Sequence, residues 1–169
     1  MTPKERIEAA QQRKAKAEAT LTPEMRTAIE EREEAERAEA EAAEVEAKIR
    51  GHELALAVER LAPLHGGHLR AIDLESREPG HGTWIVKPAG GDVMKQFHRD
   101  AKAPNADSDA MNRRVAEACV VYWNGADEDA IDGEKMHALW DTFGAIPTTL
   151  GNAAVELGGF VAETRKSGR

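Results

Sequence analysis

The fold is decided by residues 23–50, which read PEMRTAIEEREEAERAEAEAAEVEAKIR. This stretch consists mostly of Ala, Glu, Arg and Lys, which have high helix propensity. Thr22 can cap the first turn, and Pro23 suits the first helical position because the amide there has no acceptor within the helix. Gly51 is the expected stop at the other end. The pattern therefore predicts one helix over about residues 23–50, roughly 40 Å long.

A shorter helix is predicted before it, over about residues 3–19. A Thr-Pro pair opens this helix as well, and Pro23 disfavours a helical conformation at the residue that precedes it. Residues 1–50 hold 13 Glu, 12 Ala and 10 Lys or Arg, with no Gly, Asp or aromatic residue. We call residues 1–50 the charged helical arm and expect it to precede a separate compact domain, residues 51–169.

The longer helix of the arm carries few large apolar residues, namely Met25, Ile29, Val45 and Ile49. A coiled coil needs large apolar residues at the a and d positions of successive heptads, and this helix does not supply them. We therefore expect a solvated helix that is marginally stable alone. The four apolar residues are candidate contacts for a protein partner, while a plain spacer without a partner is the alternative.

The compact domain is expected over residues 51–169, because all 14 Gly and every aromatic residue lie from Gly51 onward. Residues 53–61 fit a short helix of their own. An unbroken helix through Gly51 is the alternative, at a cost of about 1 kcal/mol for the glycine. A β-hairpin is predicted over residues 68–88, where two strand-like runs flank a stretch rich in Gly and Pro.

Helices are predicted for the rest of the domain. The clearest amphipathic helix begins at a cap, Asp107 or Ser108, and runs to Tyr122. The other predicted elements are a helix that Asp92 caps, an acidic loop over residues 124–133, a helix over residues 134–143 and a helix from Pro147 onward. The sequence thus predicts a mainly α protein, with a long charged N-terminal helical arm followed by a small α-rich domain that contains one β-hairpin.

Composition and charge argue against several classes of partner. The net charge of −8 disfavours nonspecific binding to DNA or RNA, since phosphate contacts need clustered Lys and Arg. No apolar run approaches the roughly 20 residues that span a bilayer, and the N-terminal residues lack the apolar core of a signal peptide. We expect a cytoplasmic protein without nucleic-acid or membrane partners. Cys119 lies in an apolar run and is interpreted as a small buried residue.

The sequence predicts no catalytic, cofactor or metal site, and we expect no enzyme. His65 and His68 flank two glycines, but a structural zinc site needs a full set of Cys and His ligands. Residues 127–133 look superficially like a calcium-binding loop. However, Ala130 and Leu139 stand where that pattern needs ligands. A Gly-Gly turn and an acidic solvated loop are the favoured interpretations.

Aromatic residues gather around the acidic loop. Tyr122 and Trp123 end one predicted helix, while Trp140 and Phe143 belong to the next. Because only 4% of the chain is aromatic, this group indicates either the centre of the C-terminal core or a docking surface. We favour the core, and we keep Trp123, Trp140 and Phe143 as candidate partner-binding residues.

Three segments of the C-terminal half follow one another in a characteristic order. They are GTWIVKP (residues 82–88), AEACVVY (residues 116–122) and LGNAAVELGG (residues 150–159). The order is an extended segment ending in Pro, then a helix running into Cys-Val-Val-Tyr, and then a closing helix. Over roughly residues 80–160 the chain thereby resembles the tail assembly chaperones of long-tailed bacteriophages.

The resemblance implies a small non-enzymatic protein that coats the tape-measure protein and helps to recruit tail-tube subunits. It also implies that the protein is absent from the finished particle and needs no cofactor. A marginally stable arm suits a long helical client, because such segments can cover large surfaces when they order on binding. The alternative is a structural virion or scaffold component whose arm contacts neighbouring subunits, including copies of itself in a homo-oligomer.

Overall fold

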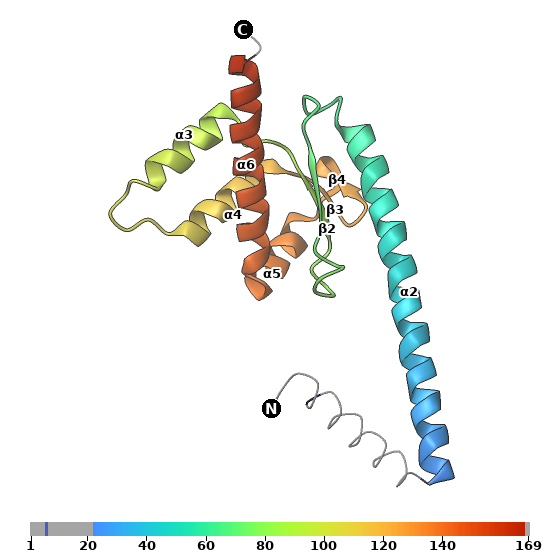
Figure 1. Cartoon of the computed structure of the whole chain (residues 1–169). Coiled ribbons are helices and arrows are strands. Elements are labelled where there is room, and N and C mark those ends of the chain that lie inside the picture. Colours follow the sequence, from blue (N-terminus) through green and yellow to red (C-terminus); the bar gives the residue numbers. More distant parts are fainter. Residues whose placement is uncertain (1–5, 7–21, 168–169) are drawn as a thin grey trace. The chain divides into compact units, whose positions relative to one another are not determined.

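The computed structural model describes Arg6 and residues 22–167. The chain forms two compact units, Met1–Glu46 and Ala47–Arg169, and Figure 1 shows its helices and strands coloured along the sequence. The expected fold class is confirmed, since helices dominate and a long helix stands near the N-terminus. The helix predicted over residues 3–19 lies outside the described residues, except for Arg6, which is helical.

The long helix α2 (Pro23–Leu61) begins where the sequence predicts. Thr22 caps it, because the Thr22 Oγ1 accepts a hydrogen bond from the Met25 amide at 3.3 Å. Every residue from Pro23 to Glu46 is exposed. In this part the helix is therefore supported by helix propensity and local side-chain pairs, and packing contributes little.

The predicted helix end at Gly51 is wrong, because α2 continues unbroken to Leu61. Burial explains the continuation. Leu54, Ala57 and Leu61 each expose at most 5% of their surface, and burying two leucines contributes about 3 kcal/mol or more. A helical glycine costs only about 1 kcal/mol, so the helix passes through it.

Four strands form one antiparallel sheet in the order β1-β2-β3-β4. The strands are β1 (Arg70–Asp73), β2 (Thr83–Val86), β3 (Val120–Trp123) and β4 (Ala126–Asp127). The predicted hairpin is present as β1 and β2, with Ile72 opposite Trp84. The sheet is larger than a single hairpin, because β3 pairs with β2 and places Tyr122 opposite Ile85.

The helical assignment of residues 120–122 is wrong. Helix α4 (Ser108–Cys119) ends at Cys119, and the Val-Val-Tyr-Trp run that follows forms β3. These β-branched and aromatic residues favour an extended strand. Asn124 and Gly125 then adopt φ values of 45° and 91°, as in the two-residue hairpin turn that an Asn-Gly pair favours. That pair is the sequence signal for the β3–β4 hairpin.

The remaining helices lie close to their predicted positions. They are α3 (Gly91–Asp100), α5 (Gly133–Thr142) and α6 (Ala145–Ser167), and a 3₁₀ turn η1 (Glu128–Ala130) lies in the predicted acidic loop. Asp107 caps α4 as predicted, because its carboxylate accepts from the amides of Asp109 and Ala110. The predicted cap at Asp92 is wrong, since Gly90 holds the cap position and Asp92 lies in the first turn of α3.

Helices flank both faces of the sheet, as Figure 1 shows for the unit from Ala47 onward, and apolar side chains fill both contacts. On one face the end of α2 packs Leu54, Ala57 and Leu61 against β2 and β3. On the other face the larger core joins residues of β2, α4, α5 and α6. Its most buried members include Trp84, Trp140, Ile146 and Leu150.

Helices α4 and α6 approach each other closely in this core. A Cβ atom at Gly151 would stand only 2.4 Å from the Asn112 carbonyl oxygen. A larger residue there would push the helices apart, so glycine sets the distance between them.

Candidate protein-docking surfaces

Large apolar side chains remain uncovered on α2 and in the turn that follows it. Among the described residues, the exposed large hydrophobic ones are Met25, Ile29, Val45, Ile49, Leu56 and Leu64, which expose 42–73% of their surface. The first four are those that the sequence nominates as partner contacts. Met25 and Ile29 stand one helical turn apart, and so do Val45 and Ile49.

The apolar residues of α2 divide by face in the second unit. Ile49 and Leu56 stand two turns apart on one side of the helix and are exposed, whereas Leu54 and Leu61 are buried against the sheet. In the first unit, Met25 and Ile29 stand one turn apart and are both exposed. Each unit thus carries an exposed apolar pair at helical spacing.

The aromatic candidates belong mainly to the core. Trp140 exposes only 1% of its surface, so the core interpretation applies to it and it presents no docking surface. Trp123 is half-buried and stacks on Trp84, with ring centroids 5.3 Å apart. Phe143 is half-buried as well and lies 4.3 Å from the ring of His81. These contacts leave Trp123 and Phe143 at the margin of the core.

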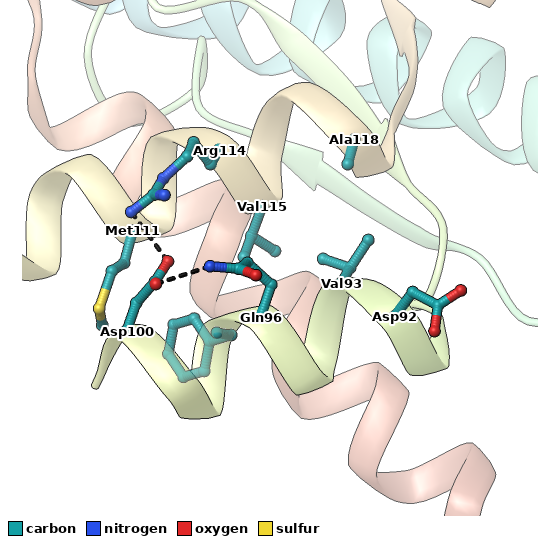
Figure 2. Close-up of a pocket in the computed structure, with 9 residues that line it drawn as sticks. Asp92, Val93, Gln96, Asp100, Met111, Arg114, Val115 and Ala118 are labelled. Carbon is teal, nitrogen blue, oxygen red and sulfur yellow. Dashed lines mark hydrogen bonds and ion pairs between the residues drawn. The ribbon is translucent and has the colours of Figure 1, made fainter. Parts of the chain in front are cut away.

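A groove between α3 and α4 adds a surface that the sequence does not reveal (Figure 2). It has a volume of about 300 Å³. Apolar side chains of both helices line it, among them Val93, Phe97, Met111 and Val115. Asp92 stands at one end, as Figure 2 shows. The groove offers an apolar interior with a carboxylate at its rim.

An ion pair closes the opposite end of the groove. Arg114 reaches Asp100 at 3.0 Å, and the Gln96 amide donates to the same carboxylate at 2.7 Å, contacts that Figure 2 marks with dashed lines. Helix α3 nevertheless has no buried residue, although its apolar positions fall on one face. Its apolar face is therefore only half covered by the rest of the domain.

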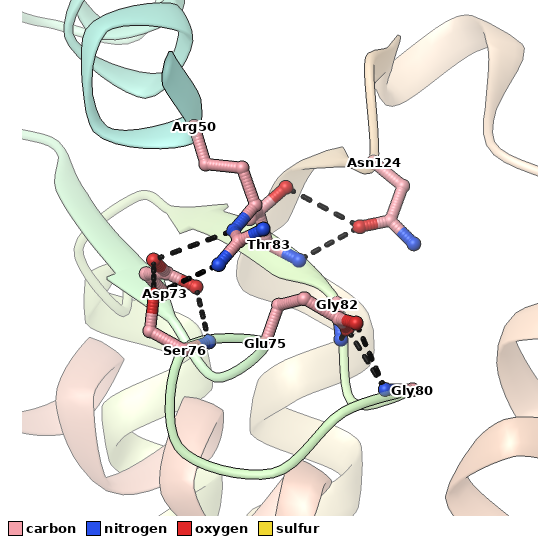
Figure 3. Close-up of polar contacts among 8 residues, drawn as sticks. All are labelled: Arg50, Asp73, Glu75, Ser76, Gly80, Gly82, Thr83 and Asn124. Atoms are coloured by element: carbon pink, nitrogen blue, oxygen red, sulfur yellow. Dashed lines mark hydrogen bonds and ion pairs between the residues drawn. The ribbon is translucent and has the colours of Figure 1, made fainter. Parts of the chain in front are cut away.

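Polar contacts hold the turn between β1 and β2 in place (Figure 3). The Glu75 carboxylate accepts hydrogen bonds from the amides of Gly80 at 3.0 Å and Gly82 at 2.8 Å. These bonds keep the pKa of Glu75 below its ordinary value. Asn124 accepts from the Thr83 amide at 2.7 Å, which ties the two hairpins together. These polar groups have structural roles.

His65, considered as a metal ligand, lies beside a carboxylate, and the Cys119 thiol is buried. His65 lies 3.8 Å from Glu128, which also pairs with Lys87 at 2.9 Å. Burial raises the pKa of the Cys119 thiol to about 11, so the thiol is protonated near neutral pH. Among the described residues, no group of three or more His, Cys, Asp or Glu lies close enough to hold a metal ion.

No protein-family model matches the chain, and no curated protein or solved structure shows significant similarity to it. Over the part of the chain that the structure covers, no helix has the length and apolar character to cross a membrane.

Proposed function

We propose that this chain is a non-enzymatic assembly chaperone of the type its C-terminal half resembles. Its clients are the tape-measure protein and the tail-tube subunits of a bacteriophage tail, and it acts in the host cytoplasm. It holds these proteins before they assemble and leaves before the particle is complete.

The observation that carries this proposal is the distribution of exposed apolar residues. The exposed large hydrophobic residues of the described chain all fall between Met25 and Leu64, and the domain beyond Leu64 has none among its described residues. These side chains expose 42–73% of their surface, so covering one of them contributes about 1 kcal/mol. A long helical client that lies along α2 would cover the five on the helix, from Met25 to Leu56, whereas Leu64 lies beyond the helix end.

The groove between α3 and α4 supports the same role in the second unit. Its volume of about 300 Å³ admits apolar side chains from one face of an amphipathic helix. Asp92 is fully exposed at its rim and pairs with Lys95 at 3.3 Å, so a basic residue of the client would have to displace Lys95 to reach this carboxylate. We therefore assign the groove to a helical client segment with an apolar face.

Co-expression with the tape-measure protein that the proposal names as a client tests the proposal. We expect a stable complex in a pull-down through a tag on this chain, and a matched pull-down with tail-tube subunits should also recover a complex. Recovery of neither protein would contradict the proposed function.

Mass spectrometry of purified particles separates the chaperone from a structural component. A chaperone leaves the assembly, so we expect no peptides of this chain in finished particles. A fixed ratio of this chain to the tube subunits would instead identify a virion or scaffold component.

A further inference from the structure

The outer edge of β1 carries backbone groups that the sheet does not use. The Leu74 amide donates to the Gly82 carbonyl at 3.1 Å, so the antiparallel register also turns the N–H and C=O groups of Ile72 toward β2. The N–H and C=O groups of the alternate residues, Ala71 and Asp73, therefore point away from β2. Within the described residues these groups have no backbone hydrogen-bond partner, which leaves an open strand edge.

A polar hollow of about 390 Å³ lies along this edge. One wall is β1, and α6 forms the other through Thr149, Asn152 and Glu156. Arg70 of β1 reaches Glu156 of α6 at 2.8 Å across the hollow. Ile72 adds an apolar surface, because it lines the hollow and packs against the core. An edge strand flanked by a helix is the arrangement in which some domains bind an extended peptide as an additional strand.

The charges of the hollow leave one cation without a partner. The Asp73 carboxylate accepts from the Ser76 amide at 3.0 Å and lies 3.9 Å from Arg50, as Figure 3 shows. Arg77 also lines the hollow, and its exposed guanidinium makes no ion pair or side-chain hydrogen bond with any described residue. The hollow therefore favours a ligand that brings a carboxylate to Arg77.

We propose that the β1 edge binds an extended segment of a partner protein as a fifth strand, with a carboxylate of that segment on Arg77. The added strand pairs with the free N–H and C=O groups of Ala71 and Asp73. Its side chains alternate between the hollow beside α6 and the opposite face of the sheet. Main-chain hydrogen bonds supply affinity, and Arg77 selects acidic segments. This site is distinct from the α2 residues and the α3–α4 groove, and it does not depend on the proposed function.

Selection from a displayed library of short random peptides tests this site on the full chain. We expect the enriched peptides to be rich in β-branched residues and to carry Asp or Glu. Ala71→Pro removes an outward amide hydrogen that the sheet does not use, which edge strands tolerate. The Ala71→Pro variant should bind the enriched peptides with an affinity lower on the order of tenfold or more. Ala71→Val keeps the amide hydrogen and should bind them as the wild-type chain does.

Two further variants test the hollow without changing the backbone of β1. Asn152→Trp fills the hollow from α6 and should weaken binding as strongly as the proline does. Arg77→Gln should lower the affinity for acidic peptides on the order of tenfold. It should not change the affinity for the same peptides synthesised with Gln in place of the acidic residue. Circular dichroism confirms the folding of each variant. Failure to enrich any peptide, or equal binding by the folded Asn152→Trp variant, would overturn the proposal.

Discussion

Arg60 of α2 and Asp127 of β4 form a two-pronged ion pair that joins the end of the helix to the last strand of the sheet. The Arg60 Nη2 donates to the Asp127 Oδ1 at 2.8 Å, and the Nη1 donates to the Oδ2. The hydrogen bond from Arg60 is the main reason that the pKa of Asp127 lies below its ordinary value. Both side chains are more than a third exposed, so water weakens the attraction between them.

Asp127→Asn removes this pair and should destabilise the chain slightly at neutral pH. Because the folded state lowers the pKa of Asp127 from 3.8, the pair stabilises the fold above that pH. This contribution disappears as the pH falls through the lowered pKa. Urea unfolding should therefore show a difference between wild type and variant at about pH 7 that shrinks at about pH 2. A difference that grew in acid would be inconsistent with this sign.

Gly51→Ala and Gly151→Ala should change stability in opposite directions. Gly51 lies within α2, and nothing lies within 4 Å of its would-be Cβ. Alanine there should stabilise the chain by about 0.5–1 kcal/mol. Gly151→Ala should destabilise it, because the new Cβ would meet the Asn112 carbonyl oxygen at 2.4 Å.

Thermal and chemical denaturation measure both glycine variants. A loss of stability in Gly51→Ala would indicate a left-handed glycine that ends the helix, and would restore the predicted helix end.

Leu150→Ala and Leu64→Ala make the same chemical change in opposite environments. Leu150 is fully buried in the larger core, whereas Leu64 is 73% exposed. We expect Leu150→Ala to lower the free energy of unfolding by about 2–5 kcal/mol. Leu64→Ala should change it by no more than about 0.5 kcal/mol. Guanidinium titrations of the two variants give both values, and similar losses would contradict the assignment of the core.

The Cys119 thiol should react with a thiol reagent only after the chain unfolds. It is 1% exposed and its pKa is raised to about 11 by burial, so little thiolate is present or accessible near neutral pH. The rate of reaction of the thiol with a disulfide reagent, followed by absorbance with and without denaturant, measures its accessibility. Rapid reaction in the folded state would place the thiol at the surface.

The elements that the sequence predicts well are those whose signals are local. The start of α2 follows from Thr22 and Pro23, and the start of α4 follows from the cap at Asp107. The β1–β2 hairpin follows from two β-rich runs around a Gly-rich turn. The cap contacts lie within three residues along the chain, and the paired hairpin residues lie 10 to 16 residues apart.

The errors arise where distant contacts override a local preference. Gly51 stays helical because Leu54 and Leu61 bury against a sheet that is formed later in the sequence. Val120–Trp123 leaves the helix because β2 offers a strand partner, although the following Asn-Gly pair could have indicated a hairpin. The choice of partner-binding residues depends on distant contacts as well. The sequence favours the core for the aromatic group but keeps Trp140 as a candidate, and the packed structure shows that Trp140 is buried.

The α3–α4 groove lies beyond sequence-based prediction for a related reason. The spacing of Val93 and Phe97 indicates an amphipathic helix. Whether another element covers that face depends on the path of the whole chain, and here it is only half covered.

Binding of the purified tape-measure protein to surface variants tests the central claim most directly. The variants are the pair Met25→Ser with Ile29→Ser in the first unit and the pair Ile49→Ser with Leu56→Ser in the second, and Leu64→Ser is the exposed control. If α2 carries the client, each paired variant should lose on the order of tenfold in affinity or more, since covering the exposed half of each apolar side chain contributes about 1 kcal/mol. The control should bind as wild type does. Wild-type affinity in both paired variants, with folding intact by circular dichroism, would contradict α2 as the docking surface.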